Sequence, residues 1–310
     1  EKLVHHSKEK WYWTSEAYPA DGVSLRSISS DNFVVVDTTG KARVIAEVDF
    51  TAALTTLHEK AIYICEGEQY FVEKLDYAER KAYVKRTDVD YYTDAIDYRK
   101  IKILDQFDSR PLGRFTAVHG EVHVATQVVG FKKIKFHTQE NVGSGELSLP
   151  TNEMHTTATW VTIPADLVQL LPFTPEQKIN GLYGLSYIMH HVAPLFLMCD
   201  LHDIGVSLGD NSTGESIPPR ELQTRFQPGP IATYADADFE PNIFIYDNYP
   251  GGIGLSPSLF DLDKRLLDFC LRTIMACPCR EGCPSCVGPT KESGEGAKDV
   301  AVDLLTRLLS

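Results

Sequence analysis

The chain has 310 residues, of which 43% are hydrophobic and 24% are charged, a composition that is ordinary for a folded globular protein. Its formal net charge of −13 argues against broad, nonspecific coating of DNA by this chain alone. No apolar run approaches the ~20 residues that a membrane-spanning helix needs, so we expect no membrane partner.

The first third of the chain predicts a β-rich module. Residues 1–30 show no periodicity and are expected to be irregular. From Phe33 onward, segments rich in β-branched and aromatic residues alternate with turn-forming residues, at 33–37, 42–48, 61–65, 70–75, 82–86 and 89–93. Short strands at such regular spacing predict a small β-barrel of SH3-like size. Because Arg110-Pro-Leu-Gly113 predicts a boundary, we expect one domain over residues 1–112 and a second over 113–310.

The remainder predicts a mixed α/β domain, so the expected fold class of the whole chain is α+β. A long β-branched segment runs from 115 to 137, with Gly130 as a break or bulge, and a strand is expected from Thr156 until Pro164. Thr174-Pro-Glu-Gln177 predicts a helix start. Further strands are expected from 204 and from 242, and helices over 259–276 and 296–309.

Four of the seven cysteines gather near the end of the chain: Cys277, Cys279, Cys283 and Cys286. Disulfides are one interpretation, but nothing in the sequence indicates secretion. A redox pair in Cys283-Pro-Ser-Cys286 is another, although it leaves the first two cysteines unexplained. Zinc is favoured, because four thiolates complete a tetrahedral Zn²⁺ site. Such a closed site predicts a structural zinc knuckle rather than a catalytic metal, with its charge offset by Arg272, Arg280 and Lys291.

No catalytic constellation stands out. His119-Gly-Glu121 is typical of zinc deaminases, but the cysteines that should accompany it have the wrong spacing, and its context predicts a strand. No glycine-rich loop carries the lysine of a P-loop, and Pro250-Gly-Gly-Ile-Gly-Leu255 favours a tight turn over a phosphate site. Asp200, Asp203 and Asp247 could form a carboxylate metal site only if the fold brings them together, so their role stays open.

Basic residues gather in two places in this acidic chain. The stronger group, Lys132, Lys133 and Lys135, is followed by His137 and is our candidate for nucleic-acid contacts. In a strand, Lys133 and Lys135 share one face and Lys132 points to the other. These lysines could guide single-stranded DNA, with Phe131 and Trp160 as candidates for base stacking. The weaker group comprises Arg80, Lys81, Lys85 and Arg86. The alternative for both groups is an ordinary solvated strand face.

Several sequence blocks, taken in order, carry a resemblance to a known family. They are Ala61-IYICEGEQYFVEKLD-Tyr77, Val129-GFKKIKFHTQENVGSGELSLP, His155-TTATW, Cys199-DLHDIGV, Tyr246-DNYPGGIGLS and Cys277-PCREGCPSCVGP. They resemble the zinc-binding C-terminal region of MrfA-type helicases, bacterial DNA-repair proteins that are related to fungal RecQ-like repair helicases. The cysteine block, together with Pro-Gly-Gly-Ile-Gly before it, is the most specific part of the resemblance.

The resemblance implies an activity that composition alone does not. Members of the family are ATP-dependent superfamily 2 translocases that move 3′ to 5′ on single-stranded DNA, with the ATPase in two RecA-like domains upstream. The resemblance also implies that the four cysteines bind zinc and that residues 1–60 follow a winged-helix-like segment. The implied partners are single-stranded DNA and the motor domains of the same chain, in a bacterial, cytoplasmic, nucleoid-associated protein.

Two functions stay open at this point. The favoured one is a DNA-guiding region of a DNA-repair helicase with a structural zinc. The first residue is Glu rather than Met, so we expect a fragment whose ATP and Mg²⁺ sites lie in motor domains outside this chain. We expect such a fragment to hydrolyse no ATP by itself. The alternative is a stand-alone zinc-dependent enzyme that acts on a nucleobase or a phosphate ester.

Overall fold

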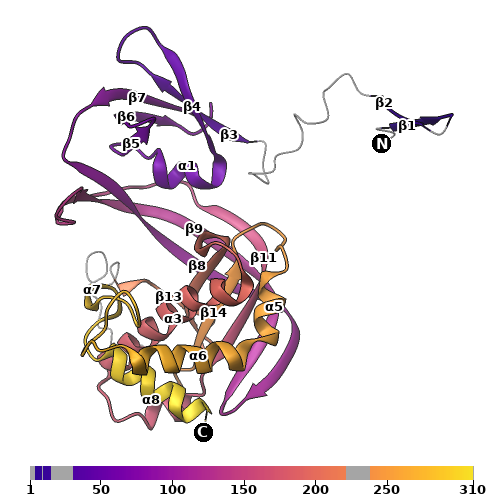
Figure 1. Cartoon of the computed structure of the whole chain (residues 1–310), viewed down its shortest axis with the longest axis vertical. Helices are drawn as coiled ribbons and strands as arrows, with labels where there is room; N and C mark the ends of the chain where they lie inside the picture. The colour runs from indigo at the N-terminus through magenta and orange to yellow at the C-terminus, as the bar shows by residue number, and fades with distance from the viewer. Residues whose placement is uncertain (1–3, 9, 15–30, 221–237, 310) are drawn as a thin grey trace. The chain divides into compact units, whose positions relative to one another are not determined.

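The computed structural model describes residues 4–8, 10–14, 31–220 and 238–309 (Figure 1). The chain divides into two compact units. The first comprises Glu1–Ile96 and Val128–Leu149, and the second comprises Asp97–Gln127 and Pro150–Ser310. None of the described helices is long and apolar enough to cross a membrane.

The start of the chain differs from the irregular segment that we expected. There, β1 (Val4–Ser7) and β2 (Lys10–Trp13) pair as antiparallel strands, with Val4 opposite Trp13. Residues 15–30, for which irregular chain was also expected, lie outside the described residues.

The first unit is built on a five-stranded sheet. Its strands are β3 (Asn32–Asp37), β4 (Arg43–Asp49), β5 (Ile62–Cys65), β6 (Glu68–Asp76) and β7 (Lys81–Thr87), in the order β4-β3-β7-β6-β5. Phe33 and Val35 are fully buried and alternate with partly exposed neighbours, so one face of β3 carries the core. That core includes Ala53 of α1 (Phe50–Thr56) and Leu57 directly after it.

The strand pairing of this sheet does not close a barrel. β3 pairs with β7 in parallel, whereas the other neighbours are antiparallel. A parallel pair needs a crossover connection, which β4, α1, β5 and β6 supply here. Within residues 31–149, all of which are described, no ladder joins β4 to β5 at the two ends of the strand order. The predicted strands up to residue 87 are present, but an SH3-like barrel is not confirmed.

Two long strands run from the first unit into the second. β8 (Tyr91–Leu112) pairs with β9 (Phe115–Lys135), and Gly113 in the turn between them has φ +61°. A Cβ at Gly113 would collide with the carbonyl oxygen of Leu308, which is why glycine is needed there. The predicted domain boundary at 112/113 falls at this turn, inside the second unit, and stays a prediction. Near the far end of β9, β10 (Asn141–Glu146) pairs with it in the first unit.

The second unit is organised around a largely antiparallel sheet. Beyond β9, the strands follow in the order β11 (Asn152–Thr162), β14 (Pro241–Asp247), β12 (Ile204–Asp210) and β13 (Glu215–Ile217). All of these neighbours pair antiparallel. β14 lies in the interior of this order and every one of its residues is buried, so it forms the centre of the unit.

Helices cover one face of this sheet (Figure 1). The described α-helices of this unit are α2 (Ala165–Gln169), α3 (Pro175–Leu197), α5 (Leu255–Asp261), α6 (Asp263–Ala276), α7 (Thr290–Ser293) and α8 (Ala297–Leu309). α3 and α5 contact the strands, and α7 and α8 pack on α3. α3 begins with the predicted capping box of Thr174 and Gln177, and Pro194 lies inside its last turn. The single helix predicted over 259–276 is wrong in one respect, because α5 and α6 divide at Leu262.

The opposite face of the same sheet is covered by a strand. Val161 and Ile243 belong to the core beneath the helices, whereas the alternate residues Trp160 and Phe244 belong to a separate core. That second core is closed by Ile101 of β8, whose side chain is 6% exposed. The central sheet is therefore held between a helical layer and one long strand.

A buried histidine couples the stability of the first unit to pH. His58 is fully buried, and its ring stacks on Phe131 with the centroids 4.9 Å apart. A carbonyl oxygen only accepts, so His58 Nδ1 must donate to the Glu59 carbonyl oxygen at 3.0 Å, which leaves Nε2 without a partner among the described residues. Burial lowers the pKa of His58, because the protonated ring would place a charge in this core.

We predict that His58→Phe makes the first unit less sensitive to acid. The unfolded chain takes up a proton on His58 below about pH 6.5 and the folded unit resists it, so wild-type stability is lost as the pH falls through that value. The loss amounts to at most ~1.4 kcal/mol per pH unit. Hydrogen exchange of buried β6 amides between pH 7.5 and 5.5, corrected for intrinsic rates, should show a flatter profile in His58→Phe. The matched control is His137→Phe at an exposed position of the same unit, which should keep the wild-type profile.

Candidate metal centre

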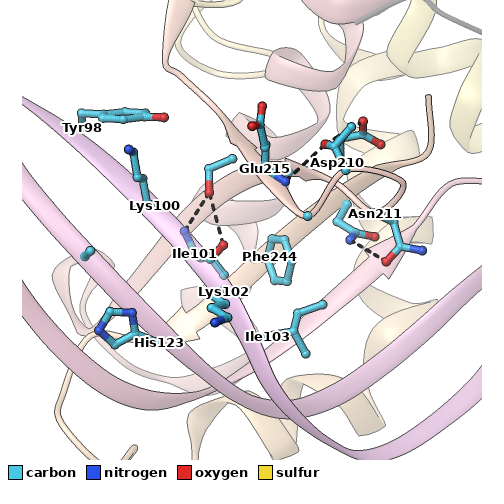
Figure 2. Close-up of a pocket in the computed structure, with 16 residues that line it drawn as sticks. Tyr98, Lys100, Ile101, Lys102, Ile103, His123, Asp210, Asn211, Glu215 and Phe244 are labelled. Atoms are coloured by element: carbon cyan, nitrogen blue, oxygen red, sulfur yellow. Dashed lines mark hydrogen bonds between the residues drawn. The ribbon is translucent and has the colours of Figure 1, made fainter. Parts of the chain in front are cut away.

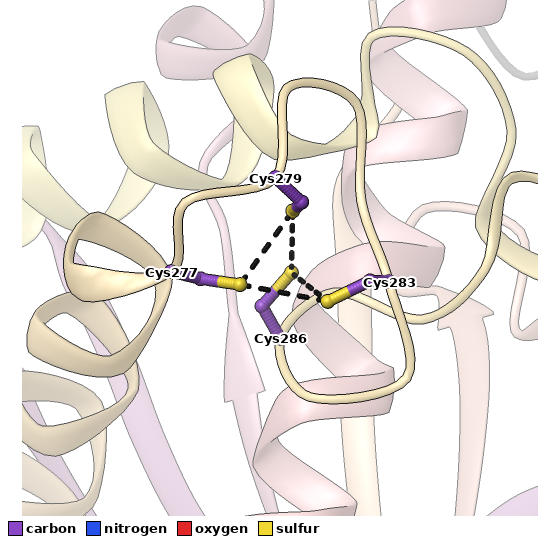
Figure 3. Close-up of side chains that lie close together, drawn as sticks. All are labelled: Cys277, Cys279, Cys283 and Cys286. Atoms are coloured by element: carbon purple, nitrogen blue, oxygen red, sulfur yellow. Dashed lines mark hydrogen bonds between the residues drawn. The ribbon is translucent and has the colours of Figure 1, made fainter.

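The four clustered cysteines converge on one point (Figure 3). Their Sγ atoms lie 3.6 Å apart for Cys277 and Cys279, 3.5 Å for Cys277 and Cys283, 3.4 Å for Cys279 and Cys286, and 3.7 Å for Cys283 and Cys286. A tetrahedron with Zn–S bonds of ~2.3 Å has S–S edges of about 3.8 Å. Four of the six S–S edges are close to this length, and all four Sγ atoms lie within 4.8 Å of one another, so the donor set can hold one tetrahedral zinc ion.

Tight turns bring the thiols together. α6 ends at Ala276, and the amides of Cys286 and Gly288 then donate to the Cys283 carbonyl oxygen at 3.0 and 3.1 Å. Gly282 has φ +134°, and a Cβ there would lie 2.8 Å from the Gly288 carbonyl oxygen, so the chain can close on itself only with glycine.

The knuckle is anchored to the helical layer at its closing end. Cys286 and Val287 are buried in the main core. A Cβ on Gly184 of α3 would come within 3.0 Å of the Val287 side chain, so this helix approaches the knuckle closely. Tyr187 of α3 also donates its hydroxyl to the Pro284 carbonyl oxygen at 3.1 Å. The position of the thiols is thus coupled to the packing of α3.

A lysine that the sequence interpretation missed holds the first half of the knuckle. Lys298, in the first turns of α8, donates to the carbonyl oxygens of Cys277 and Cys279 at 2.7 and 2.6 Å and lies 3.6 Å from Cys279 Sγ. Zinc with four thiolates carries two negative charges, and Lys298 offsets one of them. Of the residues expected in this role, Arg272 instead pairs with Asp268 at 2.7 Å.

One thiol is prepared for metal binding near neutral pH. A hydrogen bond from the Ser285 backbone, followed by the neighbouring Cys277, lowers the pKa of Cys283 to about 7. Because zinc binds the thiolate and releases the proton, a lowered pKa favours Cys283 as a ligand.

The backbone amides of the glycine-rich loop at 250–255 bind a carboxylate of the chain itself. Asp247, at the end of β14, is fully buried. Its Oδ2 accepts from the amides of Ile253, Gly254 and Leu255 at 2.7, 2.9 and 3.1 Å, and its Oδ1 accepts from Ser256 at 2.8 Å. These amides are therefore not available to a phosphate, which confirms the interpretation of this loop as a structural turn.

The remaining acidic candidates also have structural partners. Asp200 accepts from the His202 amide at the start of the short 3₁₀ helix Leu201–Asp203, and Asp203 accepts from the Tyr249 hydroxyl at 2.5 Å. Among the described residues, the cysteine cluster is the one group of three or more possible ligands that meets. No metal site is therefore formed by Asp200, Asp203 and Asp247, all of which are described residues.

The deaminase-like pair is not assembled. His119 packs its ring against Phe107 and Phe260, with centroid distances of 5.5 and 6.0 Å. Glu121 instead faces His155, with Nδ1 and Oε1 3.9 Å apart. Neither residue belongs to the cysteine cluster, so no open catalytic zinc site of this kind exists among the described residues.

The lysine strip lies on β9 in the first unit, paired with β10. The register places Lys133 opposite Gly143 and Lys132 opposite Ser144, so the two point to opposite faces as expected. Lys133 Nζ lies 4.9 Å above the centre of the Tyr91 ring, and Lys135 Nζ lies 4.0 Å from an Asp90 carboxylate oxygen.

The expected stacking residues and the second basic group have other roles. Phe131 is 2% exposed and Trp160 is 1% exposed, so both candidates are core residues and not base-stacking platforms. Each cation of the second group is paired with a carboxylate: Arg80 with Asp31, Lys81 with Glu79, Lys85 with Glu73 and Arg86 with Glu68. That group is an ordinary solvated strand face.

We predict that Lys298→Met weakens zinc binding by roughly tenfold, because outer partners of metal ligands typically contribute that much or more. Competition with a chromophoric chelator measures the affinity. Lys291→Met removes the same charge from an exposed position on α7 and should leave the affinity within about twofold of wild type. Equal affinities in the two variants would show that Lys298 is only a surface charge.

Comparisons with known proteins agree with this geometry. The family profile described as the MrfA Zn-binding domain matches residues 185–287, which include the four cysteines. The uncharacterized ATP-dependent helicase YprA of Bacillus subtilis (strain 168) is 37% identical over 99% of this chain and 38% of its own length. The ATP-dependent helicase HRQ1 of Saccharomyces cerevisiae is 24% identical over 92% of this chain and 26% of its own length.

A solved structure extends the match to the fold. The crystal structure of the DUF1998 helicase MrfA bound to DNA has a TM-score of 0.57 and 36% identity, and the match covers 99% of this chain and 38% of that chain. This chain thus spans less than two fifths of the length of each of these three relatives. Residues 185–287 therefore carry an MrfA Zn-binding domain, and the chain as a whole is similar to a part of the MrfA-type helicases.

Proposed function

We propose that this chain is the DNA-guiding region of an ATP-dependent 3′–5′ DNA-repair helicase and is stabilised by a structural zinc. The observation that carries the proposal is the convergence of four thiols inside a sequence that matches helicases along nearly its whole length. ATP and Mg²⁺ would act in motor domains on the part of the relatives that this chain does not span. The helicase MrfA in the solved structure is bound to DNA, which supports DNA as the partner of this chain too.

Bound zinc would act as a crosslink between the end of α6 and the loop that leads to α7. The chain's own residues do the rest of the work. Cys277, Cys279, Cys283 and Cys286 supply all four ligands, Lys298 neutralises charge at the first two, and Val287 buries the closing end. Because the four thiolates complete the coordination sphere, this site favours a structural role over a stand-alone zinc-dependent enzyme.

The two parts of the chain divide this function. We assign zinc binding to residues 113–310, and we assign the link to the motor domains to residues 1–112, which include the remnant of a winged-helix-like segment. The proposed location is bacterial, cytoplasmic and nucleoid-associated, because the proposed partner is DNA. The lysine strip of Lys132, Lys133 and Lys135 is the proposed track for a single strand.

We predict that Cys283→Ser reduces the zinc content of the purified chain from about one equivalent to less than half. It should also lower the midpoint of thermal unfolding by several degrees, because a structural zinc contributes directly to folding. Metal analysis and calorimetry measure the two effects. Cys199→Ser, at a half-buried cysteine outside the knuckle, should keep the full zinc content. Less than half an equivalent in the wild-type protein would remove the basis of the assignment.

We predict that Lys133→Glu combined with Lys135→Glu weakens single-stranded DNA binding by the full-length protein. The loss should be similar for all sequences, and the salt dependence should flatten by roughly one to two charges' worth, because phosphate contacts release counterions. Titrations at several salt concentrations measure this. Lys81→Glu with Lys85→Glu makes the same charge change at paired lysines and should have a smaller effect. Unchanged affinity and slope in the folded strip variant would reduce the strip to a solvated face.

A further inference from the structure

The second unit contains a cavity of about 780 Å³ that the sequence interpretation did not anticipate (Figure 2). It lies between β8 on one side and the β12–β13 turn on the other, above Phe244 of β14. A volume of this size accommodates a small organic ligand, since such sites usually measure ~300–1,000 Å³.

The cavity follows from the way in which β8 crosses the sheet. The Ile101 amide donates to the Ser216 hydroxyl at 2.7 Å, and that hydroxyl donates to the Ile101 carbonyl oxygen at 3.4 Å. This double contact fixes β8 to β13, as the dashed lines of Figure 2 show. Below it, Ile101 and Phe244 form an apolar floor that is part of a packed core. The floor is therefore preformed.

The two walls have different chemistry. The β8 wall presents the cations of Lys100 and Lys102 and the aromatic ring of Tyr98, and Lys100 Nζ lies 5.6 Å from the centre of that ring. The facing wall presents the amide of Asn211 and the carboxylate of Glu215.

Two further charged groups at the cavity are already engaged. Asp210 accepts from the hydroxyls of Ser212 and Thr213, so its carboxylate holds the β12–β13 turn. His123 lies 3.4 Å from a Glu153 carboxylate oxygen. The Asn211 amide is engaged as well, because its Nδ2 donates to a Glu240 carboxylate oxygen at 2.6 Å and its Oδ1 accepts from Asn242 at 3.4 Å. The groups that remain to meet a ligand are therefore two lysines on one side and the Glu215 carboxylate on the other.

We propose that this cavity binds a nucleoside phosphate, as one nucleotide of single-stranded DNA. The phosphate lies at Lys100 and Lys102, the base stacks on Tyr98 over the apolar floor, and amino groups of the base meet Glu215. Lysines supply the phosphate charge, and aromatic rings supply sequence-tolerant stacking. A simple anion would make no use of the floor or of the acidic wall. This inference rests on the proposed function, because it names a second DNA contact on the same chain.

The test is the binding of a fluorescein-labelled 12-nucleotide single strand to the intact chain at 50 mM NaCl. Lys100→Gln with Lys102→Gln should weaken binding at least fivefold and make the salt slope shallower by about 1.4, because two phosphate contacts are lost. Lys178→Gln with Lys264→Gln removes the same charge from α3 and α6, on the helical face, and should change affinity less than twofold. Tyr98→Phe should bind like wild type, whereas Tyr98→Ala should lose several-fold.

A competition experiment separates a nucleotide site from an anion site. Millimolar deoxycytidine monophosphate should displace the strand, and inorganic phosphate at equal ionic strength should displace much less. Equal displacement by both, or equal affinities in the pocket and control variants, would overturn the inference. If the Lys133 and Lys135 variant loses binding while the pocket variant does not, only the pocket assignment fails. If the wild-type chain binds no strand, the DNA-guiding function fails with it.

Discussion

The second unit depends on one buried carboxylate. Asp247 ends the most buried strand of the sheet and accepts four backbone amides from the loop that follows. A fully buried charge is tolerated only when such hydrogen bonds replace its hydration. The same bonds satisfy backbone amides that would otherwise be unpaired at the start of α5. Leaving one such buried amide without a partner costs about 1–3 kcal/mol of folding free energy. Strand, loop and helix are thereby fixed together.

The loop that Asp247 holds also determines where the helices after it begin. Gly252 lies against Thr157 of β11, so a side chain there would collide with it, and Ser256 donates to the Thr157 hydroxyl at 2.8 Å. The loop is thus held on β11 as well as on Asp247, and α5 and α6 leave it in a fixed direction. α6 then delivers Cys277 to the knuckle, where Lys298 returns from α8 to meet it. The zinc ligands are close in sequence, but their support comes from distant segments.

This difference explains what could be predicted from the sequence. The helix start at Thr174, the cysteine cluster and the strands between residues 33 and 87 depend on neighbours in the chain, and those predictions are confirmed. Lys298 was missed because its contacts lie about twenty residues away and are set by how α8 packs. The SH3-like barrel is not confirmed, because β3 pairs in parallel with β7. This pairing joins segments that are far apart in the sequence, so it cannot be predicted from the spacing of the strands. The core positions of Phe131 and Trp160 could not be predicted, because an aromatic residue in a strand looks the same in sequence whether it faces solvent or the core.

The two faces of the central sheet are covered differently, by helices on one face and by β8 on the other. We relate the first face to the stability of the fold and the second to ligand binding. On the helical face, several helices fill the volume with apolar side chains, and the knuckle extends that packed layer. On the other face, β8 covers the second core with a single strand. A strand cannot fill the space beside it as a helix does, so the gap between β8 and the β12–β13 turn persists as a cavity with a rigid floor. A metal site that stabilises the fold belongs to the first face, and a site that must admit and release a ligand belongs to the second.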